Sequence, residues 1–137
     1  MMPRIALLLL PLLTACASVP GELASADRPA IEGEWRIAGI DGAPLDVPIG
    51  LSLSIDETRI DYPSGCGGHG WTYRLNGSEL ATTPARSPDM ECLARSTFPR
   101  EVFEAAAAID AATQVEQTPE NGLRLSGGGG SLTIFGQ

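Results

Sequence analysis

The chain contains no lysine, only one histidine and few aromatic side chains, which make up 5% of its 137 residues. Its nine basic residues are all arginine and stand against 17 acids, so the formal net charge is −8. Nucleic acid is excluded as a partner by this balance, because phosphate binding needs a basic footprint. A basic protein is an electrostatically compatible partner.

The chain also lacks an apolar run long enough to cross a bilayer, since the longest covers only residues 5–13. This run follows Arg4 and ends near Cys16, as in a secretory signal. We therefore predict that residues 1–15 are a signal peptide. Residues 13–16, LTAC, resemble the bacterial lipobox, in which the cysteine is acylated and becomes the mature N-terminus. The alternative is an ordinary signal peptide, cut after an Ala-x-Ala-like site, that leaves Cys16 as a spare thiol.

Residues 16–31 mix proline, glycine, alanine and charges without a period, which is typical of a flexible tether. Lipid on Cys16 would bind this tether to a membrane, each buried methylene contributing about 0.8 kcal/mol. Ala17 and Ser18 follow the cysteine, and in bacterial lipoproteins such residues direct sorting to the outer membrane. We expect an outer-membrane lipoprotein of the cell envelope that faces the periplasm.

The remaining residues, 32–137, are long enough for one domain with a modest core. Alternating apolar and polar residues predict half-buried strands, and Asn76 with Gly77 is a strong hairpin signal between two of them. The predicted strands cover residues 34–40, 49–55, 58–62, 71–75, 79–83, 113–117, 123–125 and 132–135.

One segment, residues 99–112, has helical spacing and four consecutive alanines. We expect Ser96 or Thr97 to cap this helix, with Pro99 in its first turn. The apolar positions that should share one face are Val102, Phe103, Ala106 and Ile109.

The predicted fold is mainly β, of the α+β class: a small curled antiparallel sheet that approaches a barrel, with one amphipathic helix inserted before the last strands. The side chains expected in the core are Trp35, Leu51, Leu53, Ile55, Ile60, Val102, Phe103 and Ile109.

Residues 65–71, GCGGHGW, hold the only histidine, a cysteine and four glycines, which indicates a tight bend or bulge between strands. Three interpretations of this segment compete. We favour a disulfide between Cys66 and Cys92, which an exported compartment permits and which is worth roughly 3 to 4 kcal/mol in the chain-entropy model. A metal site using both cysteines and His69 lacks a fourth ligand in a recognisable spacing. A nucleophilic Cys66 activated by His69 would need an orienting partner and oxyanion donors.

Other chemical signals are weaker. The carboxylate pairs at residues 56–57, 89–91 and 101–104 would need a cleft and a raised pKa to act as acid and base, and we interpret them as turn residues or a solvated helix face. The four glycines at residues 127–130 are followed by no lysine, so we interpret them as a flexible hairpin loop and not as a phosphate loop.

Several short motifs follow one another along residues 32–136: Trp35, Gly65 and Cys66, Met90 to Cys92, Glu101 and Phe103, Leu123 to Leu125, and Leu132 to Ile134. In their order and spacing, they resemble a META domain, the HslJ-like family. The resemblance implies a small barrel-like β fold in bacterial envelope or stress-associated proteins, without established catalytic residues.

Two functions are compatible with these features. The favoured one is a non-catalytic, lipid-anchored envelope protein that acts in stress tolerance or envelope maintenance through binding. The alternative is an acidic inhibitor lipoprotein that binds a basic wall-degrading enzyme such as lysozyme. We expect no enzyme activity, no cofactor and no metal, a monomer, and attachment to the membrane through lipid on Cys16.

Overall fold

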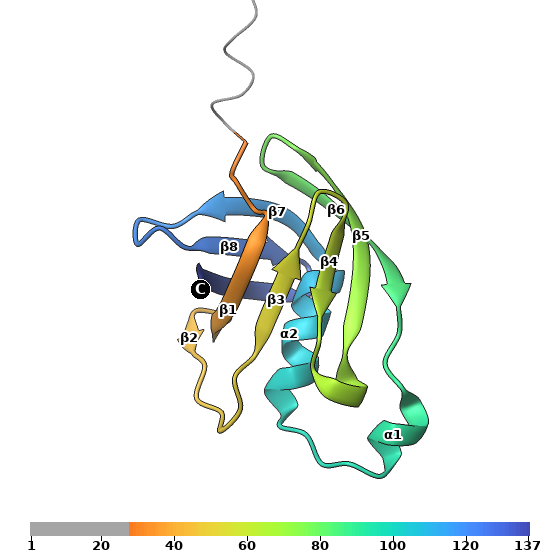
Figure 1. Ribbon diagram of the computed structural model, residues 1–137. Coiled ribbons are helices and arrows are strands. Elements are labelled where there is room, and N and C mark those ends of the chain that lie inside the picture. Colours follow the sequence, from red (N-terminus) through yellow and green to blue (C-terminus); the bar gives the residue numbers. More distant parts are fainter. Residues whose placement is uncertain (1–27) are drawn as a thin grey trace, which may run out of the picture.

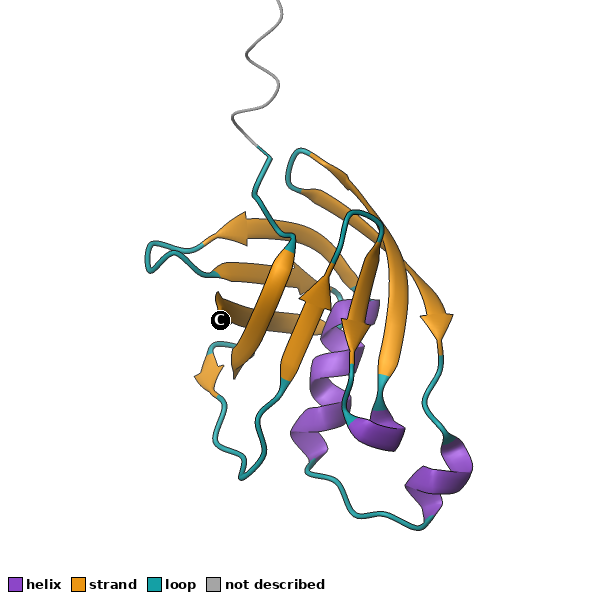
Figure 2. Ribbon diagram, in the orientation of Figure 1, coloured by secondary structure: helices purple, strands orange, loops and turns teal. Residues whose placement is uncertain are grey.

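The computed structural model describes residues 28–137, within which nine strands form one antiparallel sheet. Eight of them close into a barrel, because the last strand pairs with the first (Figures 1 and 2). The ninth strand has only two residues and pairs with the end of the first. The predicted fold class is thereby confirmed. The signal peptide, Cys16 and most of the tether lie outside the described residues.

The elements follow one another as β1 (Gly33–Ile40), β2 (Ala43–Pro44), β3 (Ser52–Ile55), β4 (Arg59–Tyr62), the 3₁₀ turn η1 (Gly65–Gly67), β5 (His69–Asn76), β6 (Glu79–Arg86), α1 (Met90–Ala94), α2 (Arg100–Asp110), β7 (Ala112–Gln117), β8 (Leu123–Gly127) and β9 (Gly130–Gly136). Each predicted strand overlaps an observed one, and the Asn76–Gly77 hairpin is confirmed by the pairing of Asn76 with Glu79. β2, η1 and α1 were not predicted, because they are too short to show a hydrophobic period.

The barrel is closed by the pairing of β1 with β9, the first and last strands of the described residues. Trp35 on β1 faces Gly136 on β9, and Ile37 faces Ile134. A register shift after Ile37 marks a bulge in β1. The closure extends beyond the strands, because the backbone N–H of Gln137 donates to the carbonyl of Glu34 at 3.0 Å.

The two ends of the barrel are covered differently (Figure 1). Residues 28–31 cross one end, where Ile31 is buried and its carbonyl accepts the indole N–H of Trp35 at 2.8 Å. A surface groove at this end is lined by Arg28, Pro29, Ala30, Ser78, Val115, Glu116 and Gln117. We call this the tether end. At the opposite end lie η1, α1, the start of α2 and the loop between β2 and β3, which together we call the helix end.

Inward-facing apolar side chains form one core inside the barrel. Most of the expected core is confirmed, with Leu53, Ile60, Val102 and Ile109 all fully enclosed. Trp35 is only half-buried and packs against the edge of the core. The remaining buried apolar residues come mainly from the inner faces of the strands.

Helix α2 covers part of the core with one face, but not with all the residues predicted for it. Its buried apolar side chains are Val102, Ala105, Ala106, Ala108 and Ile109. The expectation for Phe103 was wrong, because this residue is 42% exposed. It lies one position, about 100° around the helix, from Val102 at the centre of the buried face. The predicted cap was also wrong, since Pro99 occupies the N-cap position and no side chain caps the helix.

The four glycines at residues 127–130 form the turn of the β8–β9 hairpin, in which Gly127 pairs with Gly130. They also lie against the end of α2. A Cβ on Gly129 would come within 2.7 Å of Ala111 Cβ and 2.9 Å of Ala107 O, and one on Gly127 would collide with Ala111 O. The hairpin prediction is confirmed, but these glycines are required for close packing, not merely for a loose loop.

Candidate functional site

The glycine-rich segment lies at the helix end, where it is joined to α1 by a disulfide. Cys66 in η1 and Cys92 in α1 are bonded, with their Cα atoms 5.7 Å apart, which confirms the predicted pair. The backbone N–H of Asp89 donates to the carbonyl of Cys66 at 2.9 Å, and the Asp89 side chain accepts the N–H of Cys92 at 2.9 Å. The segment and α1 are therefore fixed to each other by one covalent link and one backbone hydrogen bond.

The histidine of this segment is held by its own neighbours. His69 Nδ1 lies 2.8 Å from the carbonyl oxygen of Gly67. A carbonyl only accepts, so Nδ1 carries a proton in this contact and the second ring nitrogen is the acceptor in the neutral form. The ring also stacks on Trp71, with centroids 5.4 Å apart and planes inclined by 8°. These two contacts give His69 a structural role.

Trp71 links the sheet to the end of α2. Its side chain is buried, and its indole N–H donates to Asp110 Oδ1 at 3.0 Å. Close by, the hydroxyl of Thr82 on β6 donates to the carbonyls of Ile109 and Asp110, at 3.2 and 3.1 Å. The free carbonyls at the C-terminus of the helix thus find partners on the barrel wall. This contact between Trp71 and Asp110 could not be predicted, because nothing local in the sequence relates Trp71 to a residue 39 positions later.

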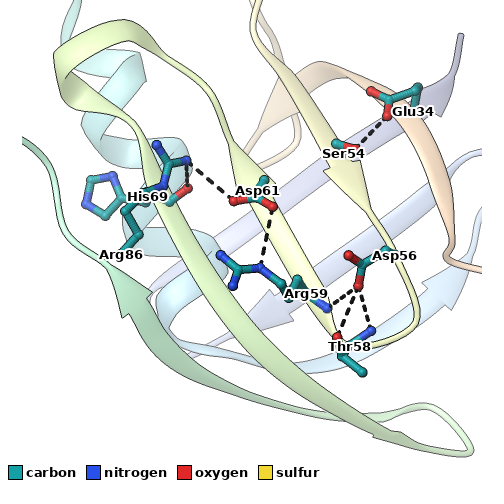
Figure 3. A network of polar contacts seen from close by, with 8 residues as sticks. All are labelled: Glu34, Ser54, Asp56, Thr58, Arg59, Asp61, His69 and Arg86. Carbon is teal, nitrogen blue, oxygen red and sulfur yellow. Dashed lines mark hydrogen bonds and ion pairs between the residues drawn. The ribbon is translucent and has the colours of Figure 1, made fainter.

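Arg86 crosses the glycine-rich strand on its outer face (Figure 3). Asp61, Gly70 and Arg86 occupy one row across β4, β5 and β6. Since Gly70 has no side chain, the guanidinium passes over it, lies 3.5 Å from Asp61 Oδ1 and donates to the carbonyl of His69 at 2.7 Å. Arg59 approaches the other oxygen of Asp61 at 3.7 Å.

Gly68 makes room for the same arginine. A Cβ at that position would come within 3.3 Å of the Arg86 guanidinium and 2.9 Å of the carbonyl oxygen of Tyr62. Gly65 is required for its backbone conformation, since other residues rarely adopt its φ of 56°. The unusual glycine content of this segment is therefore explained by backbone conformation and close packing.

Tyr62 closes the helix end from inside the barrel. Its ring is fully buried and its hydroxyl donates to the carbonyl of Val102 at 3.2 Å. Burial disfavours the phenolate and raises the pKa of Tyr62 to about 12. The residue therefore stays neutral across the physiological range and contributes to packing.

Four of the six carboxylates singled out in the sequence, Asp56, Asp89, Glu91 and Glu104, have hydrogen-bond or ion-pair partners. Asp56 accepts the backbone N–H groups of Thr58 and Arg59 at 2.8 and 2.7 Å (Figure 3), and these hydrogen bonds lower its pKa. A catalytic acid would need the opposite shift. The ion pairs Glu91–Arg95 and Glu104–Arg100 are solvent-exposed i,i+4 contacts at 3.0 and 2.9 Å.

The described residues thus form a small closed β-barrel whose helix end is stapled by a disulfide. Across residues 28–137, no cluster of three or more histidine, cysteine or acidic side chains could hold a metal ion. Within the same range, no helix has the length and apolar character needed to cross a membrane. Comparison of the chain with protein-family models, curated proteins and solved structures gave no match.

Proposed function

We propose that this protein is a non-catalytic, lipid-anchored component of the bacterial cell envelope, of the META type, that acts in stress tolerance or envelope maintenance by binding. The N-terminal sequence supports anchoring, because a short apolar run ends in a lipobox-like LTAC at Cys16. The closed barrel agrees with the fold that the META resemblance implies.

The observation that carries the non-catalytic role is the engagement of the reactive side chains. Cys66 and Cys92 are bonded to each other, so neither sulfur is available as a thiolate nucleophile or ligand. His69 uses Nδ1 on Gly67 and stacks on Trp71. The disulfide also suits an oxidising compartment such as the periplasm.

Anchoring is tested by following lipid and location together. Cells expressing the wild type or Cys16→Ser are labelled with a fatty-acid probe, and inner and outer membranes are separated. We expect label and outer-membrane location for the wild type, and loss of both for the variant. Membrane attachment that survives Cys16→Ser, together with a free mature N-terminus elsewhere, would disprove it.

The non-catalytic role is tested by complementation. In a deletion strain under envelope stress, His69→Ala should restore growth as well as the wild type does, provided that the variant accumulates to the same level. A folded His69→Ala protein that fails to complement would indicate chemistry at this residue and restore an enzymatic role.

A second candidate is favoured by the net charge of −8, which would attract a strongly basic enzyme. In this role the protein inhibits a wall-degrading enzyme such as lysozyme. Titration of lysozyme with the purified protein at near-physiological salt distinguishes the two, since an inhibitor abolishes turnover at stoichiometric amounts. Undiminished lysozyme activity at a tenfold excess would eliminate this candidate.

A further inference from the structure

The large apolar side chains that the fold leaves exposed all lie at the helix end. Among residues 28–137 they are Ile49, Met90 and Phe103, which are 39%, 69% and 42% exposed. Ile49 belongs to the loop between β2 and β3, Met90 begins α1 and Phe103 lies in the first turn of α2. Figure 1 shows these three elements together at the end opposite the tether. Scattered exposed apolar residues are ordinary, but their restriction to one end is informative.

None of the three side chains is needed to complete the core. The buried face of α2 is formed without Phe103, and β3 begins only after Ile49. α1 has no buried residue, although the disulfide and Asp89 hold it in place. The fold therefore holds an apolar residue rigidly in solvent at Met90, an arrangement typical of a contact surface.

Acidic side chains accompany the exposed apolar ones. The loop at residues 45–50 and the segment at residues 89–104 contain five acids and two arginines. Both arginines are already in ion pairs, with Glu91 and Glu104. Asp46, Asp89 and Glu101 take part in neither ion pair. Arg36 on β1 lines the same surface pocket as Ile49 and offsets one of these charges, so the helix end keeps a net negative charge beside its exposed apolar side chains.

This charge decides between the possible occupants. A second copy would bring the same acidic surface and a net charge of −8 against itself, which opposes association. A membrane surface rich in anionic lipid would be repelled in the same way. In addition, residues 28–31, the described part of the segment that follows Cys16, enter at the tether end and not at the helix end (Figure 1).

We infer that the helix end is a docking surface for a cationic protein, with Met90, Phe103 and Ile49 as apolar contacts and the surrounding carboxylates as its rim. This inference deepens the proposed binding function and rests on it. Apolar anchors within a charged rim are the usual arrangement of an energetically important contact. The carboxylates accelerate encounter and select for basic partners.

The test is photocrosslinking from two positions of the full-length, membrane-anchored protein in intact cells. A photoreactive phenylalanine replaces Phe103 at the helix end or, as the matched control, Glu116 on β7 near the tether end, which is also exposed. We expect an adduct from position 103 that mass spectrometry identifies as a basic protein, and none from position 116.

The identified protein is then purified and its affinity measured with full-length variants. Phe103→Ala and Met90→Ala should each raise Kd about tenfold or more, Glu101→Gln should slow association and weaken its salt dependence, and Glu116→Gln should change Kd less than twofold. Cooperative melting of Phe103→Ala and Met90→Ala above the temperature of the binding assay excludes unfolding as the cause.

Each other outcome has a distinct meaning. An adduct only from position 116 overturns the docking surface but leaves a binding function. An adduct from position 103 with a second copy, a lipid or an acidic protein overturns the choice of partner. The absence of any adduct from both positions counts against the docking surface and the proposed binding function together, whereas membrane attachment is tested separately through Cys16.

Discussion

Arg86 reaches Asp61 across the backbone of the strand that lies between them, and it can do so only because that strand carries Gly70 at the crossing point. An added Cβ at position 70 would lie 3.1 Å from Asp61 Oδ1 and 3.2 Å from Arg86 Cβ. The contact also places the guanidinium on the carbonyl of His69. A surface ion pair alone adds little to the free energy of unfolding. Much of the stabilisation by Arg86 therefore comes from its hydrogen bond to the carbonyl of His69.

Gly70→Ala should therefore destabilise the protein by about 1 kcal/mol, measured by urea unfolding. Gly50→Ala is the matched control, because a Cβ there meets nothing within 4 Å. In an Arg86→Ala background, the cost of Gly70→Ala should shrink. Equal losses for Gly70→Ala and Gly50→Ala, or an undiminished cost without the arginine, would contradict this account.

Reduction of the Cys66–Cys92 bond should lower the melting temperature. The bond closes a loop with a sequence separation of 26, which the chain-entropy model values at roughly 3.5 kcal/mol. Thermal melting with and without reductant measures the effect, and the Cys66→Ala/Cys92→Ala protein, which should show no response to reductant, is the control. Two titratable thiols at these positions in protein taken from the periplasm would show that the bond does not form there.

Two substitutions on α2 should differ sharply in their cost. Ile109 is fully buried, so Ile109→Ala should cost about 2 to 5 kcal/mol. Phe103 is 42% exposed, so Phe103→Ala should cost less than about 1 kcal/mol. Denaturant unfolding of both variants checks the orientation of the helix, and a larger loss for Phe103→Ala would mean that the helix is rotated from the face described above.

The stability of the protein should fall as the pH rises from about 10 to 12. Tyr62 has a folded-state pKa of about 12 against an ordinary value of 10, so the unfolded chain loses its proton first and is favoured in this window. The interpretation is unusually clean because the chain has no lysine to titrate over the same range. Tyr62→Phe should flatten the alkaline limb of a plot of unfolding free energy against pH, leaving the smaller contribution of Tyr73, whose pKa is also raised by burial. An unchanged limb would mean that Tyr62 is accessible to solvent.

The local features of this fold could be predicted from the sequence, because each has a local cause. Alternation predicts a strand at residues 49–55, and the structure has its core at residues 52–55. The hairpin after Asn76 follows from its turn chemistry, and the Cys66–Cys92 bond follows from the exported compartment and the few cysteines. In each case the necessary information lies in a short window or in the composition.

Features that depend on partners distant in the chain could not be predicted. Phe103 and Val102 lie about 100° apart around α2. Helical spacing does not show which of these two directions faces the core, and the structure leaves Phe103 exposed. The role of Gly70 depends on an arginine 16 residues later, and that of Gly129 depends on Ala107 O and Ala111 Cβ at the end of α2. A glycine in a sequence indicates either an unusual backbone conformation or a close approach of other atoms to the backbone, but it does not show which residue comes close.

β1, the first strand of the barrel, can complete its backbone hydrogen bonds only when β9, the last strand, is present. Residues 33–40 have only β2 and β3 as neighbours until residues 130–136 arrive, about 100 positions later in the chain. During synthesis or export, one edge of β1 therefore stays open until β9 has emerged. Loss of β9 would leave that edge unpaired permanently, so a chain truncated before residue 130 carries an exposed strand edge, which is a target for quality-control proteases and for aggregation.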